Sequence, residues 1–276
     1  MAPCLRPWRI MILLSTALMM EARPLVERLE LSACGNEPIR TYTNETFILM
    51  VTGTGGIRAA TAIGWAHGRF PDIRATVNIG FCGAAPEVAP MHQWHYINSI
   101  RDAATRRLSI PDILWKHGLP EAGLLTSPKV VDSPIEEKRL VDMEGSGFFE
   151  AARQFLSPDA IALLKWVSDP LTGRIEAEKT ARDYEKTFDP VIEFLKNWPA
   201  GEDKSAPDES TDWYESIVSR LRLSESQSHY MKKWLTGYGV RGGDPLKLFD
   251  CLPEKSPTTK RENTIVFERL KDVIKS

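Results

Sequence analysis

The sequence predicts an α/β fold, a three-layer sandwich with a central mixed β-sheet flanked by helices, followed by a C-terminal helical extension. Two observations predict it. Short apolar segments alternate with helical patterns from residue 11 onward, which is typical of a sheet with parallel portions. After Pro170 the pattern changes to a series of helices. We therefore expect an α/β domain over residues 11–173 and a mainly helical extension of unknown role over residues 174–276.

The composition limits the classes of function. The chain has 276 residues, 42% of them hydrophobic and 26% charged, which is ordinary for a globular protein with one large domain or two small ones. Its net charge of -2 gives no electrostatic reason to expect a nucleic acid or an anionic membrane as a partner. The four cysteines form no C-x-x-C pair, which favours reduced thiols and a cytoplasmic protein over a disulfide framework or a zinc site.

The amino terminus allows two interpretations. Arg6 and Arg9 precede an apolar run at residues 10–20, the pattern of a short signal peptide. The alternative is that Met11 to Thr16 forms the first buried strand, after a leader of ten residues. The run continues into a helical pattern at residues 21–29, which a cleaved signal does not need, so we expect the strand.

The remaining elements follow from periodicity and from turn residues. A glycine turn at residues 53–56 precedes an alanine-rich helix, and the pair Ser224 and Gln227 forms a capping box. Residues 81–85 are expected to form a small-residue loop, and residues 101–120 to be irregular. Expected strands span residues 11–16, 41–43, 47–52, 75–80, 94–100, 123–126, 140–143 and 162–169. Expected helices span residues 20–29, 57–68, 135–139, 146–155, 175–184, 190–197, 212–221, 225–236 and 264–274.

Two of these strands end in carboxylates. Val141-Asp142-Met143-Glu144-Gly145 leads from an apolar strand into a helix, and a second apolar strand ends at Ser168-Asp169. In an open α/β sheet, ligands bind at the carboxyl ends of the strands. Neighbouring strands place such acids at one edge, so Glu144 and Asp169 are candidates for one pocket.

Each candidate also has a purely structural interpretation. Negative charge is favoured in the first turn of a helix, where Glu144 lies, and Asp169 before Pro170 is a good helix N-cap. For the glycine turn at residues 53–56, the functional interpretation is that it binds a phosphate or the backbone of a ligand, and the structural one is that glycine only permits a tight turn. His92 and His95 have no third metal ligand nearby, so no metal is predicted.

The order of three motifs favours the functional interpretation. Asn78-Ile79-Gly80-Phe81-Cys82-Gly83-Ala84 is followed by Val141-Asp142-Met143-Glu144 and then by Val167-Ser168-Asp169. The sequence over residues 11–172 thereby resembles the nucleoside phosphorylase and nucleosidase superfamily. The nearest branch is that of methylthioadenosine/S-adenosylhomocysteine nucleosidase. The chain differs from the family after the acid, where Pro170-Leu171-Thr172 lacks a second acidic residue.

The resemblance implies a hydrolase that cleaves the N-glycosidic bond of a purine-type nucleoside without metal or organic cofactor. It implies that Asp169 protonates the base at N7, that Glu144 binds the ribose hydroxyls and that Glu21 orients the attacking water. It also implies a homodimer. The other residues that it assigns to the substrate pocket are Met143, Phe81, Cys82, Gly83, Val131 and Ser168.

The same scaffold also carries out phosphorolysis in the resembling phosphorylases, so phosphate is the alternative co-substrate. Those enzymes hold phosphate with an arginine after the first strand, where this chain has Glu21. At the loop positions that add an arginine and a serine in many members, this chain has Asn78 and Phe81. An acid at the phosphate position repels phosphate, which favours hydrolysis. Arg23 and Arg58 are nearby substitutes that keep phosphorolysis open.

Two further interpretations compete with the nucleosidase. The turn at residues 53–56 invites a dinucleotide site, but Arg58 occupies the third glycine position of the fingerprint. The helical extension offers a non-catalytic role, either in nucleoside binding or in interaction with a partner. A basic and aromatic pattern in this extension suits nucleic acid or a protein partner, or is simply an amphipathic helix with solvated lysines; its residues are Lys232, Lys233, Trp234, Tyr238, Arg241 and Lys247.

Overall fold

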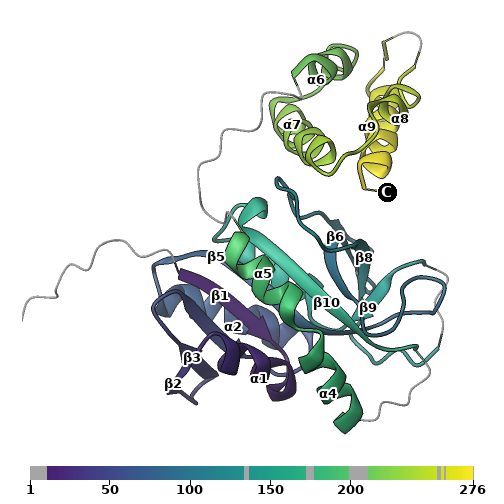
Figure 1. Ribbon diagram of the computed structural model, residues 1–276. Coiled ribbons are helices and arrows are strands. Elements are labelled where there is room, and N and C mark those ends of the chain that lie inside the picture. The colour runs from purple at the N-terminus through teal and green to yellow at the C-terminus, as the bar shows by residue number, and fades with distance from the viewer. Residues whose placement is uncertain are drawn as a thin grey trace, which may run out of the picture. The chain divides into compact units, whose positions relative to one another are not determined.

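The chain forms two compact units in the computed structural model (Figure 1). One unit is the α/β body. The other combines residues 112–117 with the helices that follow residue 210. The structure describes residues 11–133, 137–171, 177–198, 211–253, 256–257 and 259–275.

The α/β unit contains all the strands described. They are β1 (Met11–Thr16), β2 (Ser32–Gly35), β3 (Arg40–Thr43), β4 (Phe47–Val51), β5 (Ile73–Gly83), β6 (Trp94–Asp102), β7 (Leu108–Ser109), β8 (Glu121–Thr126), β9 (Leu140–Asp142) and β10 (Ile161–Asp169). Its helices are α1 (Met19–Arg28), α2 (Gly56–Arg69), α3 (Gly145–Ala152), α4 (Ala177–Lys186) and α5 (Asp189–Asn197), with a 3₁₀ turn at Pro158–Ala160.

The sheet is mixed, as predicted, and closes partly on itself. Its strand order is β10-β6-β8-β9-β5-β1-β4-β3-β2, and β10 also pairs with β5. The strands β1, β4, β5 and β10 run parallel, whereas β9 lies antiparallel to β5 and β6 lies antiparallel to β10. The carboxyl ends of β1, β5 and β10 therefore meet at one edge.

Helices cover both faces of this sheet, which confirms the three-layer prediction (Figure 1). On one face, α2 and α3 pack against the strands through a buried core that includes Leu13, Ile63 and Phe148. On the other face, the aromatic rings of β5, β6 and β10 pack against α4 and α5, as in the contact between Trp94 and Tyr184. The first strand is central and buried, so the strand interpretation of Met11 to Thr16 is confirmed.

Three sequence predictions need correction. Residues 81–83 continue β5 instead of forming a loop, because Phe81 and Cys82 pair in register with β10. The strands β2 and β7 and the helix α8 were not predicted, since all three are short, and β7 lies within residues 101–120, which were expected to be irregular. The helices α4 and α5 belong to the α/β unit, although the sequence assigned them to the helical extension. The expected helix at residues 135–139 lies partly outside the described residues.

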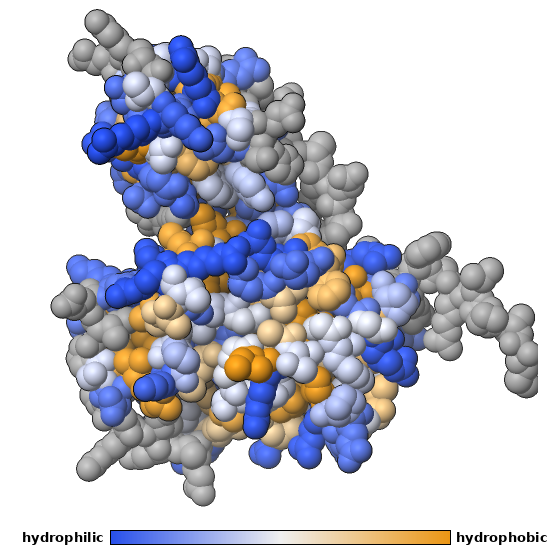
Figure 2. All heavy atoms as spheres, turned by 180° about the vertical axis from the view of Figure 1, so that it is seen from behind, coloured by the Kyte–Doolittle hydropathy of each residue, from blue (hydrophilic) through white to orange (hydrophobic). Residues whose placement is uncertain are grey.

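The second unit has its own core. It consists of α6 (Thr211–Val218), α7 (Glu225–Val240), α8 (Pro245–Phe249) and α9 (Lys260–Lys275), together with residues 112–117. Leu235, Leu248 and Leu270 are fully buried in that core, and its visible surface is mostly hydrophilic (Figure 2). Lys233 pairs with Asp112, whereas Lys232 is exposed. None of the described helices is long and apolar enough to cross a membrane.

Candidate active site

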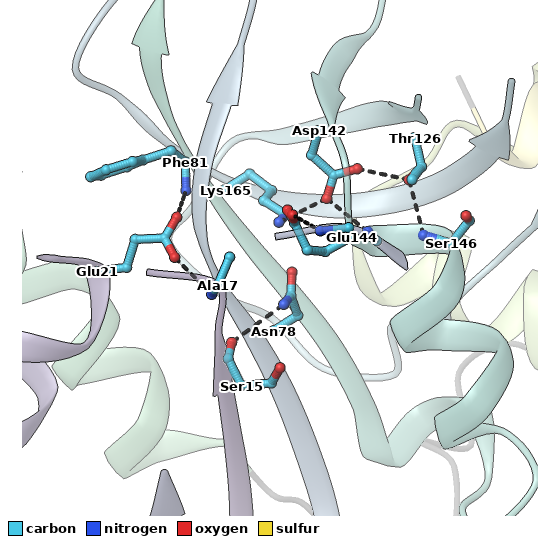
Figure 3. Close-up of polar contacts among 12 residues, drawn as sticks. Ser15, Ala17, Glu21, Asn78, Phe81, Thr126, Asp142, Glu144, Ser146 and Lys165 are labelled. Atoms are coloured by element: carbon cyan, nitrogen blue, oxygen red, sulfur yellow. Dashed lines mark hydrogen bonds and ion pairs between the residues drawn. The ribbon is translucent and has the colours of Figure 1, made fainter. Parts of the chain in front are cut away.

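Three predicted acids lie at or just after the carboxyl ends of strands in the α/β unit. Glu21 follows β1 on the first turn of α1, Glu144 follows β9 at the start of α3, and Asp169 ends β10. Figure 3 shows Glu21 and Glu144 on either side of Lys165, which projects from the middle of β10.

Glu21 is held by backbone donors. Its Oε2 accepts hydrogen bonds from Ala17 N and Leu18 N at 2.8 Å each, and its Oε1 accepts one from Phe81 N at 2.8 Å. Gly80 makes this approach possible, because a Cβ at that residue would lie 2.7 Å from Glu21 Oε1. Burial raises the pKa of Glu21 to about 7, although the backbone donors and the positive charge of Lys165 oppose the shift. A carboxyl group with this pKa can serve as a base near neutral pH.

Glu144 closes the glycine turn. Its Oε1 accepts a hydrogen bond from Gly55 N at 2.7 Å, and the side chain is buried. Gly53 and Gly55 have positive φ angles of 81° and 101°, which explains why glycine occupies both positions. Burial raises the pKa of Glu144, and the nearby Lys165 counteracts part of that rise. The backbone N–H of Gly55 in this turn therefore donates to Glu144 and not to a phosphate.

Lys165 is the residue that the sequence analysis missed. It is 1% exposed, and its Nζ lies 2.8 Å from Asp142 Oδ2. The negative charges of Asp142, Glu144 and Glu21 raise its pKa against the effect of burial. A lysine in the middle of an otherwise apolar strand was the available signal, because a buried charge requires a partner.

Asp142 is fully engaged by its neighbours, as Figure 3 shows. Besides Lys165, its Oδ1 accepts from the hydroxyl of Thr126 at 2.7 Å and its Oδ2 accepts from Gly145 N at 2.8 Å. Ser146 N in turn donates to Thr126 Oγ1 at 2.9 Å. These bonds satisfy the buried ion pair and fix the start of α3, which carries Glu144.

Asp169 is half-buried and is fixed at the end of β10. Its Oδ1 accepts from Leu171 N at 2.9 Å. The hydroxyl of Ser168 lies 3.1 Å from the carbonyl oxygen of Cys82 and 3.3 Å from Asp169 Oδ2. The pairing of β10 with β5 shifts register between Val167 and Asp169. Such irregularities commonly redirect a side chain beside an active site.

The other predicted pocket residues have different positions. Phe81 gives its backbone N–H to Glu21, while its ring packs edge-on against Tyr184 with 4.7 Å between centroids. Cys82 is buried, and burial raises the pKa of its thiol. Lys165, Asp142 and Asp169 also act on that thiol electrostatically.

Gly83 pairs with Asp169 in register, and Met143 precedes Glu144 as a half-buried residue. Val131 is half-buried in the connection from β8 to β9. Among the described residues, none of the hydrogen bonds or ion pairs that define this site involves Val131, so its role stays a prediction.

The predicted histidine pair has a structural explanation. His92 stacks on Trp166 with 5.0 Å between ring centroids, and His95 is buried on β6. Within the described ranges, no group of three histidine, cysteine or acidic residues is arranged to hold a metal ion. The charged groups of the site are the carboxylates of Asp142, Glu144 and Glu21 around the buried ammonium group of Lys165.

No protein-family model matches the sequence, and no curated protein matches it either. Solved structures do match the fold. The Helicobacter pylori 5′-methylthioadenosine/S-adenosylhomocysteine nucleosidase with butyl-thio-DADMe-Immucillin-A is 12% identical, with a TM-score of 0.56 over 68% of this chain and 99% of that chain. The fold of this chain is that of a nucleosidase.

Two further structures agree with this likeness. The apo 5′-methylthioadenosine nucleosidase of Arabidopsis thaliana is 17% identical, with a TM-score of 0.56 over 70% of this chain and 98% of that chain. A Chlamydia trachomatis MTAN bound to MTA, which carries an aspartate-to-asparagine substitution, is 20% identical, with a TM-score of 0.56 over 68% of this chain and 99% of that chain. The resemblance seen in the sequence motifs is thus confirmed at the level of the fold.

Proposed function

We propose that the protein hydrolyses the N-glycosidic bond of a purine-type nucleoside. The observation that carries this proposal is the placement of Glu21 and Glu144 around the buried Lys165, with Asp169 at the end of the same strand, in a fold like that of solved nucleosidases. Cleavage of this bond places positive charge on the sugar and negative charge on the departing base, so the reaction needs acids in separate roles.

Each acid has a role that suits its surroundings. Asp169 is the general acid toward N7 of the base, because it is half-buried and its Oδ2 accepts, among the described residues, a hydrogen bond from the Ser168 hydroxyl alone. Glu144 binds the ribose hydroxyls, and its negative charge stabilises the developing cation. Met143 packs on the sugar. Glu21 orients the attacking water and takes its proton, a role that its pKa of about 7 supports.

The contacts of the site favour water over phosphate as the nucleophile. Phe81 N donates to Glu21, Gly55 N donates to Glu144, and the ammonium group of Lys165 is paired with Asp142. Arg23 is exposed, and the side chain of Arg58 lies against Gly53. Two backbone donors and the lysine are therefore engaged by carboxylates, which repel phosphate.

The test is release of free base from methylthioadenosine, adenosine and inosine, each with and without phosphate. We expect phosphate-independent release by the wild type. Asp169→Asn should lower it by a factor of about 10² or more, because asparagine cannot donate a proton as an acid. Asp72→Asn, a substitution of an exposed acid, is the matched control and should keep full activity. Near-normal turnover by Asp169→Asn would refute the acid assignment, and release only with phosphate would make the protein a phosphorylase.

We further propose that the reaction takes place in the cytoplasm and that the protein acts as a homodimer, as the resemblance implies. Methylthioadenosine is the first nucleoside to test, because several of the structures with this fold are methylthioadenosine nucleosidases.

A further inference from the structure

Leu171 has an unusual conformation next to the proposed acid. Its φ angle is 60°, in the left-handed region that a branched side chain such as leucine rarely adopts. The side chain is nevertheless 2% exposed. Backbone conformations of this kind cost free energy and persist where the surrounding structure enforces them, which is often at functional sites.

The contacts of Leu171 explain what holds it there. Its backbone N–H donates to Asp169 Oδ1 at 2.9 Å, and its side chain covers Gly83. A Cβ at Gly83 would lie 2.3 Å from Leu171 Cδ2 and 3.0 Å from Asp169 Oδ1. The leucine methyl and the carboxyl oxygen therefore share the space that any side chain at residue 83 would need.

The two oxygens of Asp169 consequently differ. Oδ1 is enclosed by Leu171 N, the leucine side chain and the backbone of Gly83. Among the described residues, Oδ2 has one hydrogen-bond donor, the hydroxyl of Ser168 at 3.3 Å, and that hydroxyl has the carbonyl oxygen of Cys82 as its alternative acceptor. The main chain of Asp169 is also fixed, since Ala84 N donates to its carbonyl oxygen at 3.0 Å.

We propose that Leu171 is a positioning residue for the general acid, which locks Oδ1 of Asp169 and leaves Oδ2 as the single oxygen that gives a proton to the base. This inference rests on the proposed function. In the proton transfer, the Oδ2–H bond breaks, the base N7 gains the proton, and Asp169 is left as a carboxylate. In this proposal Leu171 acts only through Asp169.

Two substitutions test the inference from opposite sides. Leu171→Ala removes the covering side chain, and Gly83→Ala pushes against it. Either should lower kcat for the best purine nucleoside by about 10-fold or more with KM nearly unchanged, because small displacements of a catalytic group slow the chemical step. In the double variant the alanine methyl at residue 83 occupies space that the leucine left, so its kcat should not fall below that of Leu171→Ala.

Three controls separate positioning from general damage. Leu248→Ala removes a fully buried leucine from the helical unit and should leave kcat unchanged. Hydrolysis of 4-nitrophenyl β-D-ribofuranoside should survive in Leu171→Ala, because its leaving group needs no proton. Circular dichroism should show an intact fold for each variant.

The outcomes discriminate between the two proposals. An unchanged kcat in Leu171→Ala, or equal losses on both substrates, would overturn the positioning role while leaving the nucleosidase proposal intact. A wild type that releases no base from any nucleoside would instead overturn the proposed function itself.

Discussion

Glu21 is buried, yet its carboxylate accepts three backbone hydrogen bonds. Folding raises the pKa of this carboxyl group from 4.5 to about 7. Between these two pH values the folded protein keeps a proton on Glu21, whereas the unfolded chain has released it. The stability that this proton contributes is fully present below pH 4.5 and is lost as pH rises through about 7. The same ionisation produces the base, so hydrolysis should increase with pH through about 7 while stability declines.

Glu21→Gln tests both halves of this prediction. We expect the variant to lose hydrolysis and to show a flatter dependence of the unfolding temperature on pH between about pH 5 and 8. Thermal unfolding in a series of buffers provides the measurement. Glu27→Gln changes an exposed acid on the same helix and should keep the wild-type slope. An identical slope in Glu21→Gln would show that residue 21 does not titrate in this window.

Lys165 carries the only ammonium group described at the centre of this acid cluster. Lys165→Met should lower the free energy of unfolding by about 3–5 kcal/mol, because it leaves Asp142 as an unpaired buried charge. Adding Asp142→Asn should restore part of that loss, since both charges are then absent. Denaturant unfolding of the single and double variants measures this coupling. Equal stability of Lys165→Met and the wild type would contradict the buried ion pair.

At the scale of secondary structure, the glycines let the helices that carry the site approach each other. A Cβ at Gly147 of α3 would lie 2.3 Å from the carbonyl oxygen of Gly56 at the start of α2. Backbone cannot rotate away as a side chain does, so α3 must move and must carry Glu144 away from Gly55 N. Glu144, the residue proposed to bind ribose, is positioned by its hydrogen bond from Gly55 N. That hydrogen bond thus depends on a contact between α2 and α3 that only glycine permits.

Gly147→Ala should therefore destabilise the protein by about 1–3 kcal/mol and reduce base release. Gly64→Ala is the matched control. It lies inside α2 with no atom within 4 Å of the added methyl, so it should stabilise the helix by about 0.5–1 kcal/mol and leave activity unchanged. Chemical denaturation measures the stability of both variants, and release of free base measures their activity. A neutral Gly147→Ala would mean that the two helix starts are not in close contact.

Part of this secondary structure could be predicted from the sequence, and part could not. Apolar periodicity predicted the strands that carry Glu144 and Asp169, because buried strands have a local pattern. It did not predict that β5 continues through Phe81, since that extension depends on pairing with β10, which is distant in sequence. For the same reason, the backbone donors to Glu21 and the role of Gly80 were invisible. Lys165 could have been suspected from its apolar neighbours, but its partner Asp142 is a tertiary contact.

At the scale of the whole molecule, the chain enters the helical unit twice. Residues 112–117, between β7 and β8, belong to that unit, and the chain returns to it at α6. Ile113 is 1% exposed and Lys233 lies 3.4 Å from Asp112. The helical unit is therefore built partly from a connection that leads directly into β8. That strand ends at Thr126, whose hydroxyl binds Asp142.

Gly237 of α7 tests this attachment. A Cβ there would lie 2.6 Å from the carbonyl oxygen of Ile113, so Gly237→Ala should displace residues 112–117 from the helix. We expect faster tryptic cleavage after Lys116 and a change in Trp115 fluorescence, because the released segment gains access to solvent. Lys232→Ala changes an exposed residue of the same helix and should leave both signals at wild-type values. Wild-type proteolysis of Gly237→Ala would show that the segment is not held by α7.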